Sequence, residues 1–574
     1  MALKLFRSTG YGTLLDAQGA AAWQKLPEHA RSWNPLHILA IISVWLSSLC
    51  NYALWRELAR IGRLSSVTDY IFAVGLAVII FTAICALFSL LAWRKTIKPL
   101  AIFLLIAAAL GAHFMISYGV VIDTTMIVNV VQTDPKETLE LLNLKFFATL
   151  LVLGIIPSVW VVRARVRSVL WLKQGMLNAL FFFIFCALFA LTIAIFYQNF
   201  ASLMRNHTHV RYLINPLNSL YGLANIAATP LKKGKMALAP LGQDAKLGTS
   251  YANTSHKPPL MVLVLGETAR AGNFAINGYA RPTTPKLGAL MANEKLVSLR
   301  NVWACGTSTA ASVPCMFSHL GRDAYDARPV NYENILDVLQ RAGLAVLWLD
   351  NQSGCKSVCD RIASADTSST KGSEHCKTGE CFDEVMLENL NERIAKLPAE
   401  RRAKGVVVVM HSIGSHGPAY YKRVPQEFIK FTPICASNAL QDCKREEVVN
   451  AYDNTIAYAD HFLAATVQWL KSQSNTAQTA MIYISDHGES LGENNLYLHG
   501  LPYAVAPDVQ KRVPWITWLS DDFARRSRLN IECLRAAADT RVSHDNLFHS
   551  VLGLMDVQTT VYQRAADVYA PCVK

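Results

Sequence analysis

The chain has 574 residues, 52% of them hydrophobic, and a formal net charge of +13 at pH 7. Its length exceeds one ordinary domain, and its apolar residues are concentrated in roughly the first 200 positions, so we expect two regions that face different solvents. The charge does not indicate nucleic-acid binding, because the sequence contains no basic stripe interleaved with aromatic residues and no recognisable binding module. Attraction to anionic lipid phosphates is the simpler explanation.

Five apolar stretches are long enough to cross a bilayer of roughly 30 Å as helices of about 20 residues. They cover residues 35–54, 69–93, 99–116, 146–162 and 176–197. The N-terminal residues contain no short apolar core followed by a small-residue cleavage site, so we expect the first helix to be an uncleaved anchor. Residues 1–200 are therefore predicted to form a transmembrane bundle of five α-helices.

The charges between these stretches predict their orientation. The loops at 94–98 and 163–173 are basic, whereas the loop at 123–140 carries acidic residues. Because basic loops stay in the cytoplasm, we expect the N-terminus there and everything beyond residue 197 outside, in the periplasm beyond a bacterial inner membrane. Three arginines in the first outer loop, Arg56, Arg60 and Arg63, break this rule unless they lie on an interfacial helix.

The pattern changes after a connector at 201–257, which is predicted to be a bridging helix and a linker. From residue 258, short apolar runs alternate with amphipathic segments. Continuous hydrophobicity, typical of buried parallel strands, marks the runs 260–265, 345–349, 406–410 and 481–484. The segments 332–341 and 446–472 are predicted helices. This alternation predicts a layered α/β domain over residues 258–574.

The cysteines support a region outside the cytoplasm. The chain has 13 cysteines, of which three, Cys50, Cys85 and Cys186, lie in the predicted spans and ten lie after them. An even number in an oxidising compartment predicts disulfides. Proximity in sequence pairs Cys305 with Cys315, Cys355 with Cys359, Cys376 with Cys381 and Cys435 with Cys443, which leaves Cys533 for Cys572. Zinc coordination by Cys355, Cys359, Cys376 and Cys381 is the alternative.

Residues that commonly bind metals follow two predicted strands directly. Glu267 comes after the run 260–265, and Asp486 and His487 come after the run 481–484. Ligand sites in open α/β sheets lie at the carboxyl ends of strands, so these side chains are expected to converge. Oxygen and nitrogen ligands without thiolate suit a catalytic Zn²⁺ with an open position.

Thr309 is a candidate nucleophile. It precedes the segment 310–320, which is predicted to begin a helix whose free amide groups face an anion. A metal is needed to activate a threonine hydroxyl, so a zinc-bound alkoxide is the expected form. Thr307 and Ser308 are alternatives that sequence spacing does not separate from Thr309, and a helix N-cap is the non-catalytic interpretation.

Further polar residues are candidates for substrate binding. His416 and His499 lie in glycine-flanked loops, where they could contact phosphate, move a proton or simply support the loop. Lys356 could complement a phosphate charge or be a solvated lysine. Near Asp486, Glu489 and Glu493 are expected to orient loops rather than to bind metal.

The loop between the third and fourth predicted spans is unexpectedly polar. Asn129, Thr133 and Glu137 follow one another at four-residue steps, so on a helix they would share one face. Taken alone, this pattern favours an amphipathic helix at the membrane interface.

Several motifs carry a resemblance to a known family. Residues 266–273 (GETARAGN), 305–315 (CGTSTAASVPC), 411–418 (HSIGSHGP) and 485–493 (SDHGESLGE) resemble, in this order, segments of the lipid A phosphoethanolamine transferases, which include the mobile colistin-resistance enzymes. The resemblance implies a C-terminal α/β domain similar to alkaline phosphatase and sulfatase-type hydrolases. It places the nucleophile at Thr309 and implies that His416 and His499 contact the phosphoryl group or a second zinc.

The resemblance also implies the substrates. Lys356 matches a position that helps hold the phospholipid head group, and Asn129, Thr133 and Glu137 match polar positions that reach toward the lipid. We therefore expect a monomeric enzyme with one tightly bound Zn²⁺ and a possible second one. It would transfer phosphoethanolamine from phosphatidylethanolamine to lipid A through Thr309, release diacylglycerol and lower susceptibility to polymyxin.

Other activities stay open on sequence alone. Transfer to the lipopolysaccharide core or to protein is possible, as are glycerol phosphate transfer and a membrane phosphodiesterase or sulfatase-like hydrolase. A receptor or scaffold with a structural metal is the non-enzymatic alternative.

Overall fold

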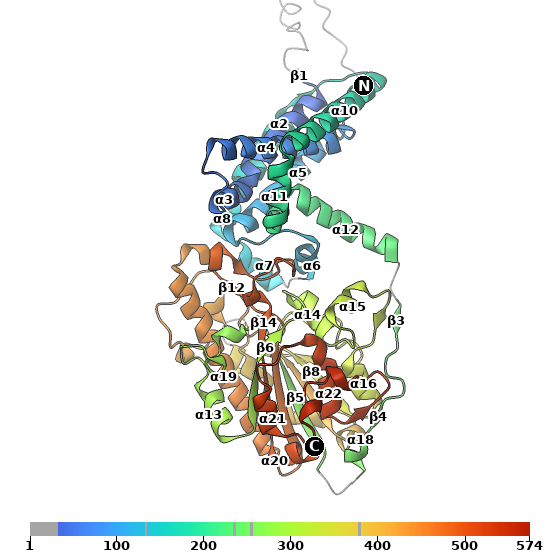
Figure 1. The fold of residues 1–574 in the computed structure, drawn as a ribbon, viewed down its shortest axis with the longest axis vertical. Coiled ribbons are helices and arrows are strands. Elements are labelled where there is room, and N and C mark those ends of the chain that lie inside the picture. Colours follow the sequence, from blue (N-terminus) through green and yellow to red (C-terminus); the bar gives the residue numbers. More distant parts are fainter. Residues whose placement is uncertain (1–31, 133–134, 234–236, 253–256, 377–379) are drawn as a thin grey trace, which may run out of the picture. The chain divides into compact units, whose positions relative to one another are not determined.

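The computed structural model describes residues 32–132, 135–233, 237–252, 257–376 and 380–574 (Figure 1). The chain divides into two compact units. One comprises Met1–His113 and Phe147–Leu217, and the other comprises Phe114–Phe146 and Asn218–Lys574. The second unit therefore contains the loop between the third and fourth apolar helices as well as most of the connector and the C-terminal domain.

The described residues contain five helices that are long and apolar enough to cross a membrane, which confirms the five predicted spans. They run over Pro35–Arg60, Val67–Ser89, Ile97–Ser117, Leu144–Arg163 and Trp171–Ile195. The first combines α2 (Pro35–Ser48), a short 3₁₀ turn and α3 (Tyr52–Arg60). The second is α4 (Val67–Ser89), the third α5 (Ile97–Ser117) and the fifth α10 (Trp171–Ile195).

Local chemistry explains where some of these helices begin and how one widens. Asn34 caps α2 directly before Pro35, and Ser66 and Asp69 form a reciprocal capping box at the start of α4. The fourth span joins α8 (Leu144–Thr149) to α9 (Ile156–Arg163) through a π-helical turn over Leu150–Ile155. Pro157 follows that turn and has no amide hydrogen, which accounts for the wider turn before it. Arg56 and Arg60 lie on α3, where Arg60 pairs with Glu57.

An eight-stranded sheet forms the centre of the second unit, in the order β15-β6-β14-β11-β5-β10-β8-β9. The four predicted strands are confirmed as β5 (Pro259–Gly266), β8 (Ala345–Asp350), β10 (Val406–His411) and β11 (Gln478–Ser485). They pair in parallel around β5. The sequence analysis missed the flanking strands β6 (Leu296–Trp303), β9 (Ala363–Asp366), β14 (Arg512–Leu519) and β15 (Val542–Ser543). Of these, β14 runs antiparallel to both of its neighbours.

Helices cover both faces of this sheet (Figure 1). Side chains of β5 alternate between two cores, with Met261 and Leu263 in one and Val262 and Val264 in the other. The first core includes side chains of α14 (Thr309–Met316), α16 (Ile335–Arg341) and α22 (Leu547–Leu554). The second includes side chains of α13 (Pro285–Asn293) and α19 (Arg445–Ser472). The layered α/β domain and both predicted helices, α16 and α19, are thereby confirmed.

We call residues 114–146 the inter-span segment. It contains α6 (Thr124–Gln132) and α7 (Pro135–Leu141). After the last apolar helix, the connector contains α11 (Tyr197–Asn206) and α12 (Leu217–Lys233).

All five expected cysteine pairs are disulfides in the structure. They join Cys305 to Cys315, Cys355 to Cys359, Cys376 to Cys381, Cys435 to Cys443 and Cys533 to Cys572. The alternative zinc site is not formed, since its four cysteines are oxidised in pairs. The other three, Cys50, Cys85 and Cys186, are free thiols.

Candidate active site

The site is built at the carboxyl edge of the sheet. Glu267 directly follows β5, and Asp486 and His487 directly follow β11, which pairs in parallel with β5. All three side chains are fully buried. Parallel neighbours end at the same edge, so residues 219 positions apart in the chain come together, as the sequence predicts for these three.

These three side chains can hold a cation. One ligand atom of each of Glu267, Asp486 and His487 lies within 4.8 Å of the others. His487 Nε2 is 3.4 Å from Glu267 Oε1 and 3.3 Å from Asp486 Oδ2. Among the described residues, no group donates a hydrogen bond to Asp486 Oδ2, although this atom is buried. Burial, and then the charge of Asp486, raises the pKa of Glu267 well above its usual value. Two buried carboxylates with an unsatisfied oxygen fit a divalent metal, which would remove their mutual repulsion.

The structure distinguishes the three neighbouring hydroxyl groups. Thr309 begins α14, and its Oγ donates to Glu267 at 3.0 Å and lies 3.5 Å from His487 Nε2. Thr307 instead donates to the carbonyl of Leu501 at 2.6 Å. Ser308 donates to Asn129 at 3.0 Å. Of these three, Thr309 alone bonds to a candidate metal ligand. Sequence spacing could not separate them, because the direction in which each side chain points depends on the folded backbone.

A second layer of buried residues supports Glu267, and the sequence analysis missed it. His411, the last residue of β10, has Nδ1 3.1 Å from Asp350 Oδ2 and Nε2 3.9 Å from Glu267 Oε2. Burial opposes the charge of Asp350, but the interaction with His411 outweighs it and holds the pKa of Asp350 at about 2. The available signal was that Asp350 and His411 directly follow the predicted strands 345–349 and 406–410, in the same way as the candidate ligands follow theirs.

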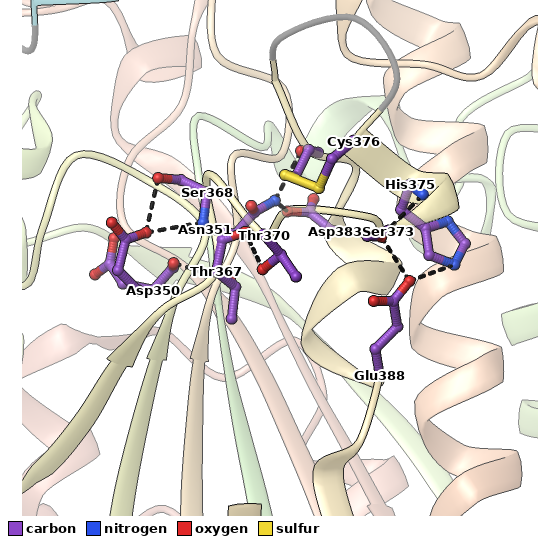
Figure 2. Close-up of a disulfide and its surroundings, with 12 residues drawn as sticks. Asp350, Asn351, Thr367, Ser368, Thr370, Ser373, His375, Cys376, Asp383 and Glu388 are labelled. Atoms are coloured by element: carbon purple, nitrogen blue, oxygen red, sulfur yellow. Dashed lines mark hydrogen bonds and ion pairs between the residues drawn. A yellow bond between two sulfur atoms is a disulfide. The ribbon is translucent and has the colours of Figure 1, made fainter.

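The loop after β10 is held from the other side by Asp383. Its carboxylate accepts hydrogen bonds from the amides of Ile413 at 2.8 Å and Gly414 at 3.1 Å. Figure 2 shows Asp383 beside Asn351, which donates to it at 2.9 Å, near the disulfide that contains Cys376. Asn351 also donates to the carbonyl of Cys381. The disulfide therefore lies within the network that positions this loop.

The remaining predicted residues line a pocket next to Thr309. The pocket is formed by polar side chains of Asn129, Lys356, His416 and His499 and by apolar side chains that include Phe114, Val120, Met126 and Leu498. The rings of His416 and His499 are 5.6 Å apart, and those of His487 and His499 are 4.3 Å apart. Burial, and then the charge of His499, lowers the pKa of His416 well below its usual value, so its ring is neutral at pH 7.

Other predicted residues have supporting contacts or lie beyond the description. His499 Nδ1 is 3.3 Å from Glu489, and Glu493 accepts from Arg270 and from the amide of Leu491. These contacts agree with the expectation that Glu489 and Glu493 orient loops. Thr133 lies outside the described residues, and Glu137 lies in α7 but its side chain is not described.

The five apolar helices and the α/β domain with its buried site are those of a membrane-anchored enzyme with a sulfatase-type domain. The sulfatase family model matches residues 259–557, and the family model for phosphoethanolamine transferase EptA/EptB matches residues 80–231. The chain belongs to the family of the phosphoethanolamine transferases that includes EptA and Mcr-1.

Relatives cover nearly the whole chain. Phosphoethanolamine transferase EptA of Escherichia coli K12 is 37% identical over 94% of this chain and 97% of its own length. Phosphatidylethanolamine transferase Mcr-1 of Escherichia coli is 36% identical over 92% of this chain and 96% of its own length. The solved structure of the integral membrane protein lipooligosaccharide phosphoethanolamine transferase A (EptA) from Neisseria meningitidis has a TM-score of 0.88 and 32% identity, covering 94% of this chain and 99% of that one. The chain is therefore a multi-pass membrane protein and a phosphoethanolamine transferase.

Proposed function

We propose that the protein transfers phosphoethanolamine from phosphatidylethanolamine to a phosphate of lipid A through a covalent intermediate on Thr309. One observation carries the proposal. The hydroxyl of Thr309, the first residue of α14, bonds to the buried Glu267. It also borders a pocket that combines Lys356 and two histidines with an apolar wall. A pocket of this composition suits a phosphodiester attached to a lipid.

The residues at the sheet edge fit a divalent cation, and we assign it as Zn²⁺. Carboxylate and imidazole donors in a small buried group, with a hydroxyl beside them, match the usual ligands of catalytic zinc. Glu267, Thr309, Asp486 and His487 would hold this Zn²⁺, which would supply positive charge to acidify a hydroxyl and to offset charge on phosphoryl oxygens. His416 and His499 could hold a second ion.

In the first stage, Thr309 Oγ attacks the phosphorus of phosphatidylethanolamine. Glu267 accepts the hydrogen bond of this hydroxyl and is the nearest group to take its proton. The bond between phosphorus and the glycerol oxygen breaks, and diacylglycerol leaves with a proton that a pocket histidine delivers. Because the lowered pKa of His416 keeps its ring neutral at pH 7, we assign this step to His499 and contact with the phosphoryl oxygens to His416. Phosphoethanolamine then remains on Thr309, with its oxygens near the first amides of α14.

In the second stage, a phosphate oxygen of lipid A attacks the same phosphorus. The bond from phosphorus to Thr309 Oγ breaks, and Thr309 takes back the proton that Glu267 received. The histidine that protonated diacylglycerol takes up the proton of the attacking lipid A phosphate, which restores the starting state. Lys356 offers a positive charge to the phosphoryl oxygens, while Asn129 reaches the site through its bond to Ser308. The apolar wall from the inter-span segment accommodates the lipid part of the donor. Thr133 and Glu137 stay candidates for contacts with the head group.

The cellular location follows from the same features. The five apolar helices and the basic loops support a location in the inner membrane with the catalytic domain in the periplasm. Five disulfides in that domain suit an oxidising compartment. We infer that it acts there as a monomer.

Mass spectrometry of lipid A tests the proposal. Cells that express the wild-type chain should show a gain of one phosphoethanolamine group on lipid A, and cells that express Thr309→Ala should not. Thr307→Ala is a matched control, because it removes a neighbouring hydroxyl that bonds elsewhere. Undiminished transfer by Thr309→Ala would rule out the nucleophile. Phosphoethanolamine found on core sugars or on protein would identify a different acceptor. Free ethanolamine phosphate would indicate a hydrolase.

Transfer to lipid A should also change the response to cationic peptides. The added ethanolamine carries a positive charge and caps a phosphate, so polymyxins should bind the outer surface less well. Expression should raise the minimal inhibitory concentration of polymyxin for wild type but not for Thr309→Ala. Equal susceptibility of both strains, with confirmed lipid A modification, would separate the activity from resistance.

A further inference from the structure

The guanidinium group of Arg423 lies in a buried cluster that joins the inter-span segment to the loop of His416. Its Nε donates to the carbonyl of His416 at 3.1 Å, and its Nη2 donates to Glu140 at 2.9 Å. The remaining terminal nitrogen pairs with Glu380. The side chains of Arg423 and Glu140 are only 2% and 5% exposed. Three different parts of the chain therefore meet on one guanidinium group.

Glu140 is the contribution of the inter-span segment to this cluster. Besides Arg423, its carboxylate accepts from Lys422 at 3.0 Å, and its carbonyl accepts from the Asn438 amide at 2.8 Å. A buried charge is costly unless it is paired, so removing the carboxylate would leave Arg423 short of a partner in a site that excludes water. Arginine suits this position because its planar fork presents several donors in fixed directions.

The same guanidinium group fixes part of the pocket wall. His416 and the two residues that follow it all line the pocket beside Thr309. On another side of the pocket, Asn129 of the same segment bonds to Ser308, the residue before Thr309. The inter-span segment therefore reaches the site at two places, once directly through Asn129 and once through Glu140 and Arg423.

We propose that Glu140 and Arg423 are positioning residues for phosphoryl transfer. Their ion pair holds the His416 side of the pocket in its reactive place only while the inter-span segment is seated on the catalytic domain. A donor lipid that occupies the pocket contacts both elements, so seating of the segment and alignment of the phosphoryl group are coupled. This inference rests on the proposed function, because it assigns His416 to the phosphoryl group.

A second ion pair offers a matched control for a merely structural role. Lys145 of the inter-span segment pairs with Asp442 of the catalytic domain, and both side chains are nearly half exposed, at 49% and 46%. This pair also bridges segment and domain, but neither residue lines the pocket. Asp442→Asn removes a bridging carboxylate in the same conservative way as Glu140→Gln.

The test uses the full-length protein in mixed micelles of detergent, phosphatidylethanolamine and lipid A. Transfer rates measured against the donor fraction yield kcat and KM. The melting temperature and the zinc content show whether each variant is folded and contains its metal.

Glu140→Gln and Arg423→Gln should each lower kcat by about tenfold or more, since a shift of about 1 Å in a reacting group can cost this much. The double variant should lose no more than the worse single variant, because both act through one pair. Arg423→Lys should recover little activity, and Asp442→Asn should stay near wild type.

The outcomes separate this inference from the proposed function. No transfer by wild type would contradict the proposed function itself. If wild type transfers, the positioning role is overturned when the kcat of folded Glu140→Gln equals that of Asp442→Asn, even with a lower melting temperature. Losses that multiply in the double variant would also overturn it, because the two residues would then act independently.

Discussion

His544 accepts a hydrogen bond from the backbone amide of Cys305 through Nδ1, at 3.0 Å. Its other nitrogen, Nε2, is 2.9 Å from the carbonyl of Ser485, to which it must therefore donate. The fully buried ring joins the loop that leads to Thr309 with the end of the strand that leads to Asp486 and His487. Only the neutral ring can make both bonds, because a protonated ring has no acceptor.

We expect His544 to make the stability of the catalytic domain sensitive to acid. Burial lowers the pKa of His544 from 6.5 to about 4. Below pH 6.5 His544 binds a proton in the unfolded chain but not in the folded domain. The contribution of His544 to the free energy of unfolding is therefore fully present above pH 6.5 and decreases as the pH falls toward 4. The loss is at most roughly 3 kcal/mol. In His544→Asn, which keeps an acceptor for Cys305 but does not titrate, this part of the acid sensitivity should vanish.

Melting temperatures of wild type and His544→Asn at several pH values between 4 and 8 test this expectation. Other titrating groups are common to both proteins, so only the difference between the curves is used. The variant should be less stable than wild type at pH 8, and the gap should narrow toward pH 4. A constant gap would show that His544 does not carry the effect.

Gly414→Ala should disrupt the candidate metal site. Gly414 has a φ of +50°, and an added Cβ would lie 2.8 Å from the carbonyl oxygen of Glu267 and 3.2 Å from its Cβ. Alanine is strained at this φ, and the contact would push Glu267 away. Zinc affinity and kcat should each fall by about tenfold or more. Gly272→Ala is the control, because an added Cβ there meets nothing within 4 Å. Equal zinc content in both variants would contradict the prediction.

Asp350→Asn should weaken zinc binding without removing a ligand. The negative charge of Asp350 holds His411, which lies 3.9 Å from Glu267. Groups that orient metal ligands typically contribute about tenfold to a hundredfold in affinity. Zinc titration in competition with a chelator measures the change. Asp366→Asn is the comparison, since Asp366 pairs with Asp350 across the sheet but is exposed at its edge. Similar zinc affinities in the two variants would show that the charge of Asp350 does not affect metal binding.

The disulfides should differ in their contribution to stability. Cys533 and Cys572 are separated by 39 positions, whereas Cys355 and Cys359 are separated by four. By the chain-entropy model, closing the longer loop stabilises the domain by roughly 4 kcal/mol and the shorter one by roughly 2 kcal/mol. Paired serine variants, compared by urea unfolding, should show the larger loss for Cys533 and Cys572. The reverse order would indicate that native contacts, rather than loop length, dominate.

Much of the architecture could be predicted because it depends on local patterns. Hydrophobic length marks the five spans, and continuous apolar runs mark the four central strands. The flanking strands β6 and β14 were not predicted, because Arg300 and Asn301 interrupt the apolar run of β6 and Pro514 lies within that of β14. Their place in the sheet depends on pairing with distant strands, which no local pattern reveals.

The candidate ligands Glu267, Asp486 and His487 could be selected from the sequence alone, because they directly follow runs of buried strand residues. The disulfide partners could also be predicted, because they are mostly close in the chain. Three further features are visible only in the folded protein. Thr309, rather than Thr307 or Ser308, bonds to Glu267, and Asp350, His411 and His544 support the site. The inter-span segment belongs to the catalytic unit. These features could not be predicted because side-chain direction and long-range ion pairs depend on how distant segments pack, whereas hydrophobic periodicity is a property of neighbouring residues.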